Sequence, residues 1–203
     1  MPRPNRPNMF TAIRTDNPKL ISELRKVQEA AVGDNYDAKD YIVPLAEAHV
    51  TLSVFELLDM RQEAFLIQEF QRSLAGKKSE LLELDKKLEF CGLGCFGDKI
   101  LYAKPIGGTD FLKCAHDILE KVIYDNNSIL KTYGYPTYNP HITMFRKPWH
   151  ATSYNNVDLF KLSDQFYNTT FGTHQATTIQ LCKMRNRMSD GYWQVISQFD
   201  LSQ

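Results

Sequence analysis

Apolar residues recur along this chain with two spacings, every second residue in some segments and every third or fourth in others. The first spacing is typical of strands and the second of helices. The first half predicts a strand over 10–13 and a helix over 18–31 that is opened by Asn17 and Pro18. A polar loop over 33–40 and a second strand over 48–55 follow. The second half repeats the strand, the helix and the closing strand, over 100–104, 111–122 and 140–145.

The two halves also share their internal spacing. Phe10 lies 39 residues before His49, and Tyr102 lies 39 residues before His141. This repeat predicts two related strand-helix-strand units, each with a histidine on its closing strand. A pseudo-two-fold axis between the units would bring the two histidines together across a cleft.

The remaining segments complete an α+β chain with mainly antiparallel sheet. They predict a helix over 56–74 and a strand over 88–96 that runs into a turn at 97–98. They also predict a C-terminal antiparallel hairpin of strands 177–184 and 192–201, joined by a turn at 189–191. No linker is long enough to separate independent domains. We therefore expect one domain over 1–203, with 1–8 as a flexible N-terminal segment.

The two closing strands each carry a His-x-Thr motif, His49-Val50-Thr51 and His141-Ile142-Thr143. A chain of this composition should contain about 0.3 copies by chance, and roughly 0.06 copies with apolar residues between and after the pair. A third copy, His150-Ala151-Thr152, lies in a polar stretch that predicts a loop, and we interpret it as accidental.

Alternation along a strand places His49 with Thr51, and His141 with Thr143, on one face. The residues between and after them, Val50, Leu52, Ile142 and Met144, then face a core. Such a cleft suits a phosphodiester: a neutral imidazole accepts the proton of the attacking hydroxyl, a cationic one protonates the leaving oxygen, and the hydroxyls bind the phosphate. Each acid or base contributes about 10²–10⁴-fold, and no metal or other cofactor is required.

Composition narrows the classes of protein further. Lys plus Arg and Asp plus Glu both number 24, so no global charge recruits nucleic acid or membrane. The four cysteines lack Cys-x-x-Cys spacing, which disfavours structural zinc. No signal segment or long apolar run is visible, so we expect a cytoplasmic or nuclear monomer without a membrane partner.

Several other residues are candidates for binding substrate. Aromatic side chains near the motifs could stack on a nucleobase, namely Phe10, Tyr138, Phe145 and Tyr192. The alternating cations before the last turn, Lys183, Arg185 and Arg187, could reach a flanking phosphate. His116 and His174 have no partner pattern, so surface or capping roles are expected.

On these motifs the chain resembles the 2H phosphoesterase superfamily over nearly its whole length. Within that superfamily it is most similar to the 2′,5′-RNA-ligase-like domain of the A-kinase anchoring protein type. The similarity lies in Pro44-Leu45, Asn139-Pro140 and the segments 179–184 and 190–192. The resemblance implies a bilobal fold, two pseudo-symmetric lobes with helices outside and a central cleft. It also implies binding of adenine or cytidine nucleotides.

For active members, the resemblance implies cleavage of 2′,5′-linked oligoadenylate or processing of 2′,3′-cyclic phosphates, with oligoadenylate, short RNA or mononucleotide as the partner. Kinase anchoring is not carried over, because the chain ends at Gln203 just after a predicted strand and no anchoring helix is visible. Two alternatives remain: a non-catalytic AMP- or CMP-type nucleotide-binding module, and a purely structural domain. Which histidine is the acid and which the base is open at this point.

Overall fold

The computed structural model describes residues 6–34, 36–133, 137–148 and 158–202. Its strands form two sheets, in which every pairing is antiparallel. The first sheet has the order β5-β2-β1-β8-β9, with β1 Met9–Arg14, β2 His49–Leu57, β5 Leu130–Thr132, β8 Thr178–Arg187 and β9 Trp193–Asp200. The second has the order β6-β4-β3-β7, with β3 Lys87–Phe96, β4 Ile100–Gly107, β6 Ile142–Arg146 and β7 Thr170–Gln175. The expected α+β class with antiparallel sheet is confirmed.

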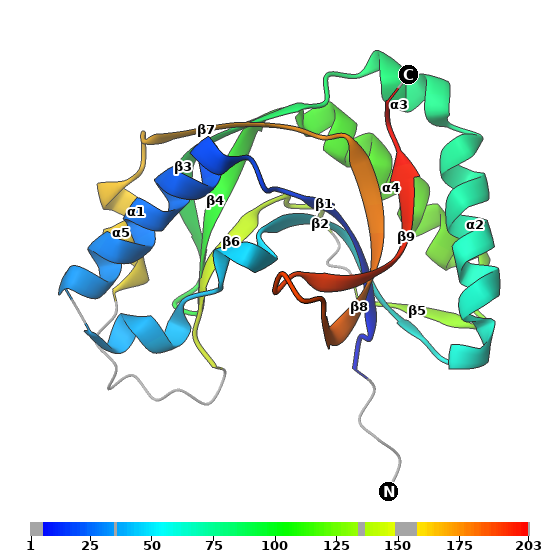
Figure 1. The fold of residues 1–203 in the computed structure, drawn as a ribbon, viewed down its shortest axis with the longest axis horizontal. Coiled ribbons are helices and arrows are strands. Elements are labelled where there is room, and N and C mark those ends of the chain that lie inside the picture. Colours follow the sequence, from blue (N-terminus) through cyan, green and yellow to red (C-terminus); the bar gives the residue numbers. More distant parts are fainter. Residues whose placement is uncertain (1–5, 35, 134–136, 149–157, 203) are drawn as a thin grey trace, which may run out of the picture.

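Helices cover the outer faces of both sheets (Figure 1). The α-helices are α1 Pro18–Asp34, α2 Glu63–Ala75, α3 Lys78–Glu83, α4 Thr109–Asp125 and α5 Leu159–Gln165, and the 3₁₀ helices are η1 Tyr36–Tyr41, η2 Leu45–Glu47 and η3 Met60–Gln62. The Asn17 side chain accepts hydrogen bonds from the backbone N–H groups of Lys19 (3.0 Å) and Leu20 (3.3 Å), which confirms it as the cap of α1. No helix in the described part of the chain is long and apolar enough to cross a membrane.

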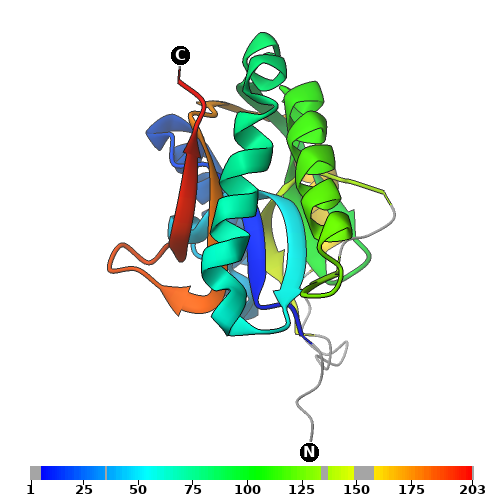
Figure 2. The same cartoon turned by 90° about the vertical axis from the view of Figure 1, so that its right-hand side faces the viewer.

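The two long helices of the repeated halves are exchanged between the sheets. Helix α1 lies between β1 and β2 in sequence, yet it packs on β7 of the second sheet. Helix α4 lies between β4 and β6 in sequence, yet it packs on β2 and β5 of the first sheet, beside α2 (Figure 2). Each half of the sequence therefore contributes its helix to the sheet that carries the other half's motif.

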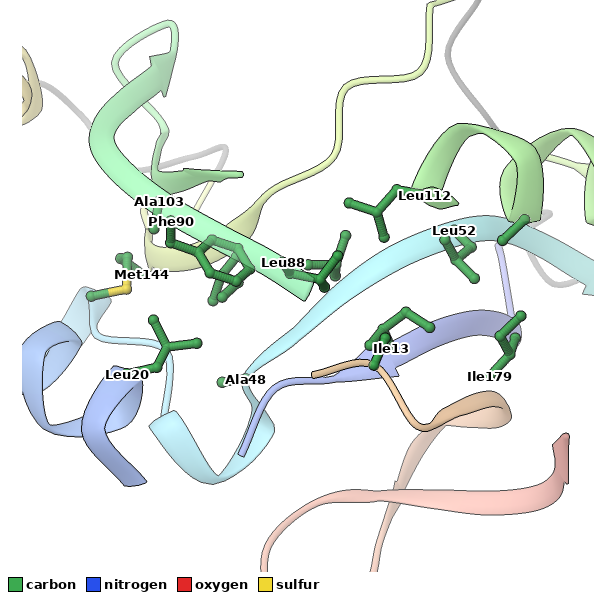
Figure 3. Packing of buried hydrophobic residues seen from close by; sticks show 14 of the residues in the cluster. Ile13, Leu20, Ala48, Leu52, Leu88, Phe90, Ala103, Leu112, Met144 and Ile179 are labelled. Atoms are coloured by element: carbon green, nitrogen blue, oxygen red, sulfur yellow. The ribbon is translucent and has the colours of Figure 1, made fainter. Parts of the chain in front are cut away.

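A continuous buried cluster joins the sheets and their helices (Figure 3). Leu112 of α4 lies near Leu52 of β2, while Leu20 of α1 lies near Met144 of β6 (Figure 3). All four side chains are at most 2 % exposed. Burial of this kind contributes about 1.5–3 kcal/mol per large apolar side chain, so the exchange of helices also ties the two halves into one core.

Two segments differ from the expectations. The predicted helix over 56–74 begins too early, because Phe55–Leu57 continue β2 by pairing with β5. The side chain of Asp59 then accepts from the N–H of Arg61 to start η3, and α2 begins at Glu63. The predicted loop over 33–40 contains most of η1. The third His-x-Thr copy, His150 to Thr152, which we interpret as accidental, lies outside the described residues.

Candidate active site

The two His-x-Thr motifs have the same pattern of burial. His49 is the first residue of β2, whereas His141 directly precedes β6 and does not lie within the strand as expected. In both motifs the histidine and the threonine are half-buried, and the two apolar residues, Val50 with Leu52 and Ile142 with Met144, are at most 2 % exposed. The prediction that these four apolar residues face the core is confirmed.

Each motif strand shifts register immediately after its threonine. Thr51 is opposite Ala12 of β1 and the next paired residue is Ser53, so Leu52 is skipped. Thr143 is opposite Tyr102 of β4 and the next paired residue is Phe145, so Met144 is skipped. A β-bulge of this kind resets the alternation of side chains between faces. Residues beyond the bulge therefore lie on the opposite face from the one that regular alternation predicts.

This reset explains one wrong prediction and one missed residue. Regular alternation would put Phe145 in the cleft and Arg146 in the core; instead Phe145 is 0 % exposed and Arg146 is exposed and lines the cleft. Phe145 therefore cannot stack on a base. The two consecutive apolar residues Met144 and Phe145 were the only signal of the shift.

Both imidazoles are held in the same way. Nδ1 of His49 lies 2.6 Å from the carbonyl oxygen of Glu47, and Nδ1 of His141 lies 2.8 Å from that of Asn139. A carbonyl oxygen only accepts, so Nδ1 carries the proton in each ring. Nε2 is then the nitrogen that can take or give a proton, and each histidine is oriented by the residue two positions earlier.

Aromatic rings surround both imidazoles. Phe10 lies 5.1 Å from His49 between ring centroids, with Trp193 at 6.4 Å and Tyr192 at 6.5 Å. Tyr102 lies at 5.2 Å from His141, with Phe96 at 4.9 Å. The equal sequence spacing of Phe10 to His49 and Tyr102 to His141 thus corresponds to nearly equal ring contacts.

These surroundings disfavour the charged forms. Burial lowers the pKa of His49 from 6.5 to about 4, against the opposing effect of its bond to Glu47, and the positive charges of His141, Arg146 and Arg187 lower it further. Burial also lowers the pKa of His141; the bond to Asn139 opposes this shift, and the charge of Arg146 adds to it. The two histidines are thus close enough to repel as cations, and Arg146 acts on both.

A cleft of about 230 Å³ opens beside the motifs. Its walls include His49, Thr143, Arg146, Arg187 and Trp193, together with the segment 40–44 before η2. Arg146 forms no ion pair with any residue that the structure describes. One cleft therefore joins the first histidine, the second threonine and an unneutralised guanidinium, which together can bind an anion.

The β8–β9 hairpin closes over the first motif (Figure 1). Arg187 pairs with Glu47 at 3.0 Å and lies over the Trp193 ring, 3.1 Å from its centroid. A Cβ atom on Gly191, whose φ is +84°, would lie 3.3 Å from Cβ of Ala46, so this turn favours glycine for both its conformation and its close approach. The hairpin therefore contributes to the burial of His49.

The hairpin is also tied to the far end of β1. Arg14 pairs with Asp190 at 2.9 Å, and its guanidinium lies 4.4 Å from the centroid of the Tyr192 ring. These contacts across the hairpin were not expected from the sequence. Opposite charges separated by more than a hundred residues give no local pattern from which to find them.

The other predicted binding residues lie in varied places. Phe10 and Tyr192 adjoin His49 but are only 2 % and 0 % exposed, so they support the imidazole and offer no open face to a base. Tyr138 stacks on His116, 4.1 Å between centroids. Lys183 pairs with Glu63 of α2 at 2.6 Å. Neither Lys183 nor the exposed Arg185 lines the cleft.

The remaining two histidines do not have the expected surface or capping roles. Nδ1 of His116 is 2.6 Å from the carbonyl oxygen of Leu52, which links α4 to β2. His174 lies in β7 and is only 8 % exposed, and burial lowers its pKa. In the described residues no three potential metal ligands of the His, Cys, Asp or Glu types gather in one place.

A bilobal antiparallel fold with paired His-x-Thr motifs defines a 2H phosphoesterase. The chain belongs to the family of the AKAP7 2′5′ RNA ligase-like domain, whose model matches residues 7–201. Human A-kinase anchor protein 7 isoform gamma is 26 % identical over 195 residues, covering 92 % of this chain and 55 % of that protein. The chain thus spans about half the length of this relative.

Solved structures share the fold at low sequence identity. E. coli LigT complexed with 3′-AMP superimposes with a TM-score of 0.59 at 15 % identity, covering 98 % of this chain and all of LigT. The protein TT0787 of Thermus thermophilus gives a TM-score of 0.58 at 18 % identity, covering 96 % of this chain and 97 % of the other. The 2H phosphoesterase fold that the resemblance implied is therefore confirmed.

Proposed function

We propose that this protein is a metal-independent phosphodiesterase that cleaves 2′,5′-linked oligoadenylate or related 2′,3′-cyclic phosphates. The observation that carries the proposal is the pair of half-buried imidazoles, each with Nδ1 bonded to a backbone carbonyl and Nε2 available for proton transfer. Membership of the AKAP7 2′5′ RNA ligase-like family supports the linkage. The LigT complex with 3′-AMP supports a nucleotide ligand by analogy of fold.

Different surroundings favour different roles for the two histidines. His49 has its pKa lowered to about 4 and stays neutral, which suits a general base. His141 experiences fewer neighbouring cations, and the negative charge of a bound phosphate would favour its protonation, which suits a general acid. Thr51, Thr143 and Arg146 would bind the non-bridging phosphate oxygens, with Arg187 at the edge of the cleft.

For a 2′,5′ linkage the step is a transesterification. The neighbouring 3′-hydroxyl attacks phosphorus while Nε2 of His49 accepts its proton. The bond between phosphorus and the 5′ oxygen breaks, and Nε2 of His141 donates a proton to that leaving oxygen. The products are a 2′,3′-cyclic phosphate and a 5′-hydroxyl, and the two histidines have exchanged protonation states.

One observation favours a second function, the binding of a mononucleotide without turnover. The pKa values of His49 and His141 are lowered from 6.5, so neither of these two imidazoles is ready as a cation at pH 7 in the free protein. The same side chains would still hold a phosphate through hydroxyl and guanidinium donors. Saturable binding of AMP or CMP with no product from any phosphodiester would support this function.

The experiment is a linkage comparison with chelator present. Purified protein is incubated with 2′,5′- and 3′,5′-linked oligoadenylates and with adenosine 2′,3′-cyclic phosphate, and the products are resolved by chromatography and mass spectrometry. We expect loss of the 2′,5′ substrate or of the cyclic phosphate with wild-type protein and not with the His49→Ala/His141→Ala double variant. Intact substrates throughout would contradict the phosphodiesterase proposal.

A further inference from the structure

The bulge in β2 presents two successive carbonyl oxygens to two side chains that stack on each other. The Tyr138 hydroxyl donates to the carbonyl oxygen of Thr51 at 3.1 Å, and Nδ1 of His116 donates to that of Leu52 at 2.6 Å. The two rings are stacked, 4.1 Å between centroids and 7° between planes. Successive carbonyls of a regular strand point to opposite sides, so this stacked pair matches the bulged conformation.

The bulge in β6 is held by a different side chain in an equivalent place. The carbonyl oxygen of Met144, the skipped residue, accepts from the Gln28 side-chain amide at 3.2 Å and from the N–H of Val43 at 3.0 Å. The same Gln28 amide nitrogen donates to the carbonyl oxygen of Val43 at 2.9 Å, and Gln28 is 7 % exposed. Gln28 therefore links Val43, which lines the cleft, to the second motif strand.

These contacts cross between the repeated halves. His116 belongs to α4 of the second half and bonds the strand of the first motif, whereas Gln28 belongs to α1 of the first half and bonds the strand of the second motif. In each case the acceptor is the residue directly after the motif threonine. Each of the two motif strands is thus bonded by a side chain from the helix of the other half.

We propose that His116 and Gln28 are positioning residues, each of which fixes the bulge that follows the motif of the opposite half and so holds the histidine and threonine of that motif in place. A buried carbonyl that loses its donor costs about 1–3 kcal/mol, and a shift of register moves side chains to the other face. Loss of either donor should therefore disturb one motif and leave the other intact. The effect on turnover rests on the proposed function, whereas the effect on motif geometry does not.

The test compares His116→Phe and Gln28→Met with a matched control. Phenylalanine keeps an aromatic ring against Tyr138 without the donor, and His116→Asn restores an amide N–H near the place of Nδ1. The control is Gln71→Met, because the Gln71 amide also joins a helix to a strand, at 2.7 Å from Oγ of Ser197 and 2.9 Å from the carbonyl oxygen of Gln198, away from both motifs. Melting temperatures of the four variants establish that they are folded.

The first readout is the NMR spectrum of the histidine rings and motif amides in the full chain. We expect His116→Phe to shift the signals of His49 and Thr51 only, and Gln28→Met to shift those of His141 and Thr143 only. We expect His116→Asn to return the signals of the first motif toward wild type. If both motifs stay unchanged, or if each variant shifts the motif of its own half, the proposal is overturned.

The second readout is turnover of the substrate found in the linkage comparison. A displaced motif should lower kcat by about 10–10² with little change in KM, while Gln71→Met keeps the wild-type value. Wild-type kinetics in both variants would overturn the positioning role even where the spectra shift. If the wild-type protein has no turnover, the proposed function fails by itself, and the crossed pattern of NMR shifts still decides the positioning proposal.

Discussion

The two His-x-Thr motifs have the same local backbone and different surroundings. Both have Nδ1 bonded to the carbonyl two residues earlier, and both strands bulge after the threonine. The first motif lies beneath the β8–β9 hairpin, with Arg187, Trp193 and Tyr192 around His49. In the second motif, His141 is flanked by Phe96 and Tyr102, and the positive charge of Arg146 lowers its pKa.

Under the proposed mechanism, a repeated unit supplies two histidines with opposite roles, one as the base and one as the acid. Duplication supplies two equivalent imidazoles, of which His49 lines the cleft, and segments outside the repeat then make their environments unequal. Burial, to which the hairpin contributes, lowers the pKa of His49 to about 4, which suits its proposed role as the base, with His141 as the proposed acid. Substitutions in either environment should therefore change one histidine more than the other.

Loss of either imidazole should have the strongest consequence, on turnover. His49→Gln and His141→Gln should each lower kcat/KM by about 10²–10⁴, because each removes one partner of the proton transfer. The double variant should be little worse than the less active single variant, since the two residues act as a unit. Steady-state kinetics on the preferred substrate measures this. Fully multiplicative losses would argue against a shared step.

A smaller effect concerns stability in mild acid. Folding keeps His49 neutral, so the unfolded chain binds the extra proton between pH 6.5 and about 4, and the free energy of unfolding falls as the pH drops through that range. A shift of this size is worth roughly 3 kcal/mol. Urea denaturation at several pH values should show a flatter dependence for His49→Gln than for wild type. An unchanged slope would mean that His49 titrates normally.

The weakest effect separates the two arginines. Arg146→Gln should raise the pKa of both histidines, whereas Arg187→Gln should raise only that of His49, because these are the cations that act on each ring. NMR titration of the imidazole signals measures both shifts. Arg146→Gln should also lower kcat/KM by about tenfold through the loss of a charged phosphate contact. Equal responses of both histidines to Arg187→Gln would remove the asymmetry on which the roles depend.

Most of the fold was predictable because its strands and long helices have clear apolar periods. Helix α1 with its Asn17 cap and the register of Val50 and Leu52 toward the core follow from local pattern alone. The end of β2 was not predictable, because Phe55–Leu57 are held in the strand by pairing with the distant β5. Only a non-local partner distinguishes that segment from the start of the next helix.

The motif residues were predictable, and the cleft around them was predictable only in part. Alternation holds up to Thr143, but the bulge at Met144 exchanges the faces of Phe145 and Arg146, so the buried ring was selected and the cleft cation was missed. Arg187 was a candidate for reaching a flanking phosphate, but its place beside Glu47 and Trp193 was not predictable, since these partners come from two different parts of the chain. Bulges and long-range ion pairs leave little trace in periodicity.

The decisive measurement for the two-histidine mechanism is the pH dependence of kcat/KM for cleavage of 2′,5′-linked oligoadenylate by wild type, His49→Gln and His141→Gln. We predict a bell-shaped wild-type profile, with an acid limb near pH 4 from the base and an alkaline limb below pH 6.5 from the acid, as the lowered pKa values require. His49→Gln should lose the acid limb and His141→Gln the alkaline limb. Absence of turnover, or the reverse assignment of the limbs, would contradict this mechanism.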